Sequence, residues 1–147
     1  MIEHVWSVIC QNAAVDNETG NVSLFNILET ITILGEASED GRLPINYEVF
    51  SEWVREDENQ PAKGTMRLFF SSPGNEGKQQ VELPVDLSEH LFARTRIKLN
   101  VLKINGSGRY KFIIKLKMDG SDQWELKATL PLIVMFSPDS EVNKGNR

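Results

Sequence analysis

The segment 110–117 constrains the fold more than any other part of the chain, because its apolar and basic side chains alternate. One side carries Tyr110, Phe112, Ile114 and Leu116, and the other carries Lys111, Lys115 and Lys117. An alternation with a period of two is typical of a β-strand that buries one face. Similar segments recur between turns rich in Gly, Asn and Asp, and no convincing helix interrupts them, with helix as the rival interpretation for 45–55 alone. The sequence therefore predicts an all-β protein.

The strands expected from these patterns each carry one apolar face. They span 4–12, 21–34, 45–55, 65–71, 78–85, 95–104, 109–117 and 123–136. Seven or eight such strands must pack two sheets together or close into a barrel. We favour an antiparallel two-sheet β-sandwich, Ig-like or C2-like, as a single domain over residues 1–136. The polar segment 137–147 is predicted to be a disordered tail.

Residues 95–104 and 109–117 form the clearest predicted hairpin, because Asn105-Gly106-Ser107-Gly108 supplies turn residues between them. When the two strands pair around this turn, their apolar side chains fall on one face. The opposite face then gathers four cations, which are Arg96, Lys98, Lys115 and Lys117. Like charges directly opposite each other destabilise a sheet unless a group of opposite charge compensates them.

Two interpretations of this basic face follow. In the first, which we favour, the cations belong to a structural ladder of ion pairs that includes Glu125. In the second, Arg96, Lys98, Lys115 and Lys117 form a surface that binds an anionic partner. The formal net charge of −5 argues against nucleic acid as a partner, because general affinity for nucleic acid requires many neutralised phosphates.

The sequence carries no pattern for catalysis, for a cofactor or for a transition metal. His4, His90 and Cys10 are the available nitrogen and sulfur ligands, and they lack the spacing of a zinc site. No Gly-x-Ser-x-Gly elbow or phosphate-binding glycine loop is present. We therefore expect a protein without enzymatic activity, in which Cys10 lies in the core because its neighbours are apolar.

The acidic loops suggest an alternative function, which is the binding of a calcium ion. Carboxylates cluster at 36–40, at 56–58 and at 119–122. If two of these loops met at one end of the sandwich, they would offer the oxygen ligands that Ca²⁺ needs, as in a C2-like domain. The sequence contains no EF-hand loop pattern, so this calcium site depends on the arrangement of the loops.

Location follows from the first residues and from the distribution of apolar ones. The chain begins Met1-Ile2-Glu3-His4 and enters a strand at once, without the pattern of a secretory signal. No apolar run is long enough to span a bilayer. These features and the single cysteine predict a cytoplasmic protein without a membrane span.

The segment 16–31, followed by Leu43-Pro44 and by Gly108-Arg109-Tyr110-Lys111-Phe112, resembles a family of uncharacterised prokaryotic β-sandwich domains. The resemblance covers nearly all of residues 4–136 and implies the fold, but no activity and no functional residue. The sequence thus predicts a non-catalytic binding or assembly module whose partner is another protein or a second copy. The alternative is a C2-like sandwich that binds Ca²⁺ or an anionic ligand through its acidic loops or basic strand face.

Overall fold

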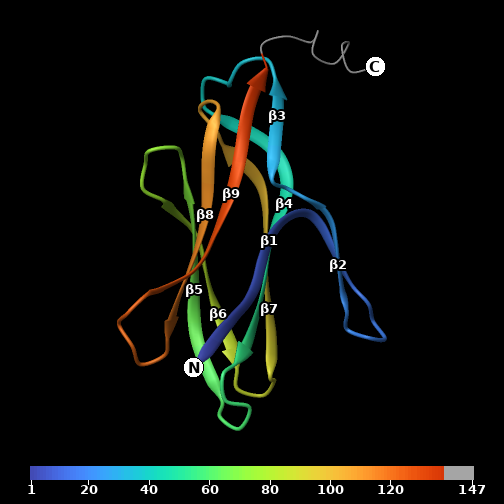
Figure 1. Cartoon of the computed structure of the whole chain (residues 1–147), viewed down its shortest axis with the longest axis vertical. Helices are drawn as coiled ribbons and strands as arrows, with labels where there is room; N and C mark the ends of the chain where they lie inside the picture. The colour runs from blue at the N-terminus through green and yellow to red at the C-terminus, as the bar shows by residue number, and fades with distance from the viewer. Residues whose placement is uncertain (138–147) are drawn as a thin grey trace.

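Two β-sheets make up the regular structure of residues 1–137, the part of the chain that the computed structural model describes (Figure 1). Sheet A has the strand order β2-β1-β4-β7, and sheet B has the order β3-β9-β8-β5-β6. In sheet A the strands are β1 (Ile2–Val15), β2 (Val22–Ile27), β4 (Arg42–Arg55) and β7 (Phe92–Lys103). In sheet B they are β3 (Thr30–Leu34), β5 (Ala62–Ser71), β6 (Lys78–Leu87), β8 (Gly108–Met118) and β9 (Glu125–Ser137). The predicted all-β class is confirmed.

The two sheets bury their apolar faces against each other in one core. Sheet A contributes Tyr47, Trp53 and Ile97, and sheet B contributes Phe112 and Ile114 among many others. The ring of Tyr47 meets the ring of Phe112 edge-on, with centroids 5.8 Å apart, so an aromatic contact joins the sheets directly. Such pairs stabilise by about 0.5–1.5 kcal/mol beyond the area they bury. The expected burial of the alternating apolar residues of β8 is confirmed.

The predicted hairpin of 95–104 and 109–117 is wrong. β7 pairs with β4 in sheet A, whereas β8 lies between β5 and β9 in sheet B. The apolar side chains of β7 and β8 are buried in the same core from opposite sheets, so the alternation of each strand is as expected although the strands do not pair. The connection between β7 and β8 crosses from one sheet to the other. In this connection the hydroxyl of the buried Tyr110 accepts hydrogen bonds from the backbone N–H groups of Asn105 and Gly106, at 3.0 and 3.2 Å.

The expected long strand 21–34 is two strands that belong to different sheets. Asn26 has a φ of 53° near the end of β2, and Leu28 and Glu29, the two residues between β2 and β3, carry the chain across. Leu28 N–H donates to the carbonyl of Ile9 in sheet A, while the carbonyl of Glu29 accepts from Ile133 N–H in sheet B. β3 then runs parallel to β9. The described residues therefore form nine strands with one parallel pair, so the prediction of seven or eight wholly antiparallel strands is wrong in those two respects.

The expected burial of Cys10 is confirmed, and Trp53 is fully buried as well. β5 and β6 form an antiparallel pair, and Pro84 lies on β6 at the edge of sheet B, where its missing N–H interrupts no inner ladder. Ser137, expected as the first residue of the tail, is the last residue of β9, and the rest of the predicted tail lies outside the described residues.

Truncation of Phe112 tests this core. Its side chain is fully buried, so we expect Phe112→Ala to lower the free energy of unfolding by about 3–5 kcal/mol. Phe92 is 53% exposed on β7 and provides the matched control. Urea denaturation of Phe92→Ala should give a change below about 0.5 kcal/mol. Equal effects of the two substitutions would contradict the assignment of the core.

Candidate functional site

The structure divides the four predicted cations between two surfaces. Arg96 and Lys98 lie on β7 in sheet A, and Lys115 and Lys117 lie on β8 in sheet B. No single face therefore contains Arg96, Lys98, Lys115 and Lys117 together, because the hairpin that would have joined them does not form. Each pair must be assessed in its own surroundings.

On sheet B, Lys115 and Lys117 contact aromatic rings rather than carboxylates. The ammonium of Lys115 lies 5.3 Å from the ring centroid of Phe69, and that of Lys117 lies 5.4 Å from the ring of Trp124. The expected contact of Lys115 with Glu125 is wrong, because Glu125 pairs with Lys127 at 3.0 Å. The guanidinium of Arg67 also lies 4.0 Å from the Trp124 ring. Trp124, which precedes β9, is thereby held on the outer side of sheet B by cation–π contacts.

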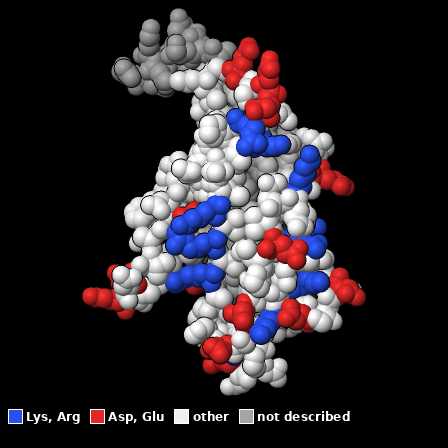
Figure 2. Space-filling view, turned by 180° about the vertical axis from the view of Figure 1, so that it is seen from behind, with Lys and Arg blue, Asp and Glu red and all other residues white. Residues whose placement is uncertain are grey.

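On sheet A, Arg96 is neutralised by a buried carboxylate. Its Nε and Nη2 donate to the two oxygens of Glu48 at 2.9 and 3.2 Å, and Nη2 also donates to the carbonyl of Ala13 at 3.2 Å. Glu48 is only 4% exposed. This bidentate hydrogen bond raises the pKa of Arg96. A column of basic side chains is visible over β7 in Figure 2. Arg94, which also lies on β7, pairs with Glu52 at 3.4 Å.

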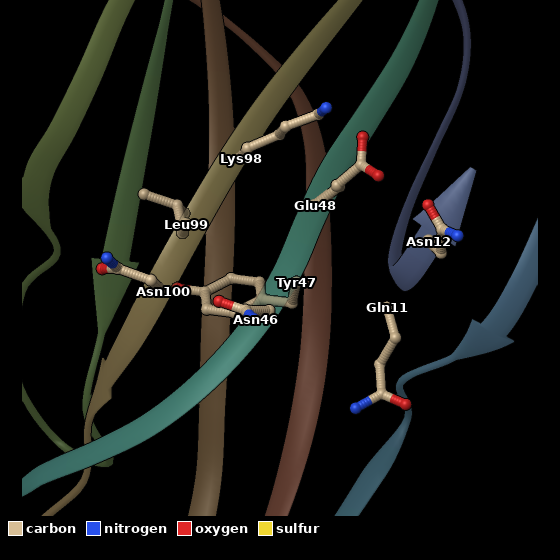
Figure 3. Close-up of a pocket in the computed structure, with 8 residues that line it drawn as sticks. All are labelled: Gln11, Asn12, Asn46, Tyr47, Glu48, Lys98, Leu99 and Asn100. Atoms are coloured by element: carbon tan, nitrogen blue, oxygen red, sulfur yellow. The ribbon is translucent and has the colours of Figure 1, made fainter. Parts of the chain in front are cut away.

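Lys98 differs from its neighbours on β7, because it makes no ion pair with any residue in 1–137. It lies at the side of a hollow of about 440 Å³ on sheet A (Figure 3). The hollow is lined by Gln11, Asn12, Asn46, Tyr47, Glu48, Lys98, Leu99 and Asn100. Within the described part of the chain, the side chains of Asn46 and Asn100 also lack hydrogen-bond partners. The hollow thus presents one ammonium and two amides to a ligand.

The other two amides of the hollow are held by the first hairpin. Gln11 Oε1 accepts a hydrogen bond from Asn26 Nδ2, and Asn12 Oδ1 accepts from the N–H of Ala13 at 2.9 Å. The strand β1 leaves β4 after Cys10 and continues with β2 alone. That change of partner opens the space beside β4 and places residues from the start of the chain opposite Lys98. Sequence spacing gave no signal for this juxtaposition.

The acidic loops do not provide the calcium site of the alternative hypothesis. The loop between β3 and β4, which holds 36–40, lies at the opposite end of the molecule from the loop between β4 and β5, which holds 56–58 (Figure 1). Among residues 1–137, no three His, Cys, Asp or Glu side chains are grouped so that they could hold a metal ion. In the same range, no helix has the length and apolar character of a membrane span.

A histidine–serine contact was missed by the sequence analysis. His4 Nε2 lies 2.6 Å from Ser7 Oγ, which lies 2.6 Å from Ser51 Oγ. A bulge in β1 between His4 and Trp6 brings the two side chains together. Burial and then the charge of Lys127 lower the pKa of His4. A catalytic triad instead orients and stabilises its imidazolium with a carboxylate, so the electrostatics here oppose general-base catalysis.

Comparison with known proteins gives no family for this chain. No protein-family model matches it, and no curated protein matches it. Among solved structures, one that it resembles is a family 123 glycoside hydrolase from Clostridium perfringens, whose study concerned glycolipid glycan hydrolysis. The alignment has 9% identity and a TM-score of 0.25, and it covers 76% of this chain but 23% of the hydrolase. A likeness this slight carries no argument about activity.

The Arg96–Glu48 pair generates a stability prediction. Substituting Arg96 by Gln leaves the buried Glu48 carboxylate without its charged partner, so we expect a loss of roughly 1–3 kcal/mol in the free energy of unfolding. Lys98→Gln on the same strand should change it by less than about 0.5 kcal/mol, because Lys98 has no such partner. Chemical denaturation of both variants checks this, and a larger loss from Lys98→Gln would contradict it.

The lowered pKa of His4 predicts a dependence of stability on pH. Below the ordinary value of 6.5, the unfolded chain takes up a proton at His4 more readily than the folded protein does, so stability falls as the solution becomes more acidic. His4→Gln should flatten the decline between pH 7 and the folded-state pKa. His90→Gln is the control. Thermal melts that show the same pH profile for His4→Gln and wild type would contradict the assignment.

Proposed function

We propose that the protein is a non-catalytic binding module, built as a β-sandwich, that takes a small polar ligand with a negative charge into the hollow on sheet A. The observation that carries this proposal is the state of Lys98. Its neighbour Arg96 is neutralised by Glu48 at 2.9 Å, whereas Lys98 makes no ion pair within residues 1–137 and lies beside amides that can accept and donate hydrogen bonds.

The charge balance of the hollow favours an anion. Glu48 and Arg96 cancel each other through a bidentate contact, so the net contribution of the lining comes from Lys98. A carboxylate or phosphate placed against Lys98 would gain a charge-assisted hydrogen bond. Hydroxyl groups of the same ligand would be satisfied by Asn46 and Asn100, since an amide side chain offers both donors and acceptors.

The size of the hollow supports a small ligand, and two residues outside the hollow, Cys10 and His4, give no support to catalysis. About 440 Å³ falls within the usual range for small-molecule sites. The thiol of Cys10 is buried and its pKa is raised, chiefly by burial, so it is a poor nucleophile. His4 contacts Ser7, and no carboxylate within residues 1–137 is its partner. The cytoplasmic location expected from the sequence stays a prediction.

Titration followed by NMR tests the proposal. Inorganic phosphate and glucuronate serve as probes, with sodium chloride at the same ionic strength as the reference. We expect saturable shifts of the amide signals of Asn46, Lys98 and Asn100. Loss of a charge-assisted hydrogen bond in Lys98→Gln should weaken binding about tenfold or more.

The control for this titration is Lys103→Gln, which removes an exposed charge from the same strand outside the hollow. It should leave the affinity within about twofold of wild type, because screening makes a distant exposed charge weak. Shifts that do not saturate, or that survive in Lys98→Gln, would contradict the proposed ligand site.

A further inference from the structure

The outer face of sheet B carries a row of cations whose charges are unpaired. Along β8, alternate side chains point away from the core, and four of them are basic, namely Arg109, Lys111, Lys115 and Lys117. None of the four forms an ion pair within residues 1–137. By contrast, Glu82, whose ladder partner Arg67 is itself paired with Lys115, is already engaged by Arg67 at 2.8 Å.

An apolar row lies beside this cationic row. On β9, Pro131 is paired with Lys111, and Ile133 is paired with Arg109. Side chains directly opposite in a ladder project from the same face. Ile133 is 37% exposed and Met135 is 54% exposed, although Leu132 and Val134 between and beside them are buried in the core. A face that joins unpaired cations to exposed apolar side chains is a candidate docking surface.

We propose that this face docks an extended segment of another protein that is rich in acidic and aliphatic residues. Charge complementarity supplies the acidic character, because four unpaired cations gather here in a chain whose net charge is −5. The aliphatic character follows from Ile133 and Met135, because these exposed apolar side chains would be buried best by aliphatic side chains of the docked segment. An extended segment presents side chains at the same period as a strand, so successive carboxylates match the spacing of cations along β8.

The geometry favours such a segment over a nucleic acid strand. From Arg109 to Lys117 the row spans about 26 Å at the rise of a β-strand, which suits a short peptide. Single-stranded nucleic acid binds through stacking of its bases on aromatic faces. Here Trp124 and Phe69 already hold Arg67, Lys117 and Lys115 against their rings. The phosphates of a nucleic acid would also leave the exposed apolar side chains of β9 without an apolar group to pack against.

One end of the docking face continues into a groove. Arg109, Pro131 and Ile133 also line a hollow of about 580 Å³ between β9 and the crossing from β2 to β3. Its remaining lining is mostly aliphatic and includes Ile27, which is 52% exposed. An aliphatic side chain of the docked segment would occupy this groove while its carboxylates contact β8.

Fluorescence anisotropy with synthetic peptides tests the proposal. The probe is a fluorescein-labelled peptide of about ten residues rich in Glu and Leu. A second peptide replaces each Leu by Ser, and a third replaces each Glu by Gln. We expect the first to bind best, with an affinity that falls as salt rises from about 50 to 500 mM. The Arg109→Glu, Lys111→Glu double variant should bind it at least tenfold more weakly.

The matched control reverses the same number of charges elsewhere. Arg42 and Lys103 are exposed partners at the end of the β4–β7 ladder, so the Arg42→Glu, Lys103→Glu variant has the same net charge as the test variant. It should bind the peptide within about threefold of wild type. Circular dichroism and thermal melting establish that both variants are folded, and Ile133→Ser provides a second test that alters no charge and should also weaken binding.

Several outcomes would overturn the proposal. Equal weakening by the control variant would show that binding follows net charge and not this face. Tighter binding of oligo-dT or of vesicles containing phosphatidylserine, lost in the Arg109→Glu, Lys111→Glu variant, would assign the face to nucleic acid or to a membrane surface. Self-association that the same variant abolishes would assign it to a second copy of the chain.

Discussion

The contact between the apolar faces of the two sheets determines the rest of the structure. Phe112 on sheet B meets Tyr47 on sheet A and also packs against Phe70, with ring centroids 5.8 and 4.8 Å apart. Because these faces are buried against each other, every strand must direct its opposite side chains outward. The polar hollow and the cationic row are therefore on the two outer sides of one core. Neither surface exists without the separation of β7 from β8.

Burial also explains why similar cations have different roles. Arg96 forms an ion pair with Glu48, whose carboxylate is almost excluded from solvent. The charge of Arg96 therefore stabilises the folded protein by compensating a buried negative charge. Lys98, two residues away on the same strand, makes no ion pair within residues 1–137 and lies beside the hollow on sheet A. On sheet B, Lys115 and Lys117 are placed against aromatic rings. Local surroundings, not residue type, decide which cation is structural.

The sequence was sufficient to predict most of the strands and the burial of their apolar faces, but not the break within 21–34 or the pairing of strands. The alternation around Phe112 identified β8 and its buried side, because periodicity depends on neighbours in the chain. The apolar side chains of β7 and β8 are buried equally well by edge pairing or by packing across a core, so the sequence could not distinguish these arrangements. The contact of His4 with Ser7 depends on a bulge, and the hollow at Lys98 depends on the point where β1 leaves β4. Both are set by tertiary structure.

The central claim is that β7 and β8 belong to different sheets. Backbone nuclear Overhauser effects between neighbouring strands test it directly, because they report protons within about 5 Å, the spacing of paired strands. We predict cross-strand effects between Glu48 and Lys98 and between Arg67 and Lys115, which the structure pairs. A ladder of effects that joins the backbones of Val101 and Phe112 would show that the two strands form a hairpin and would contradict the account.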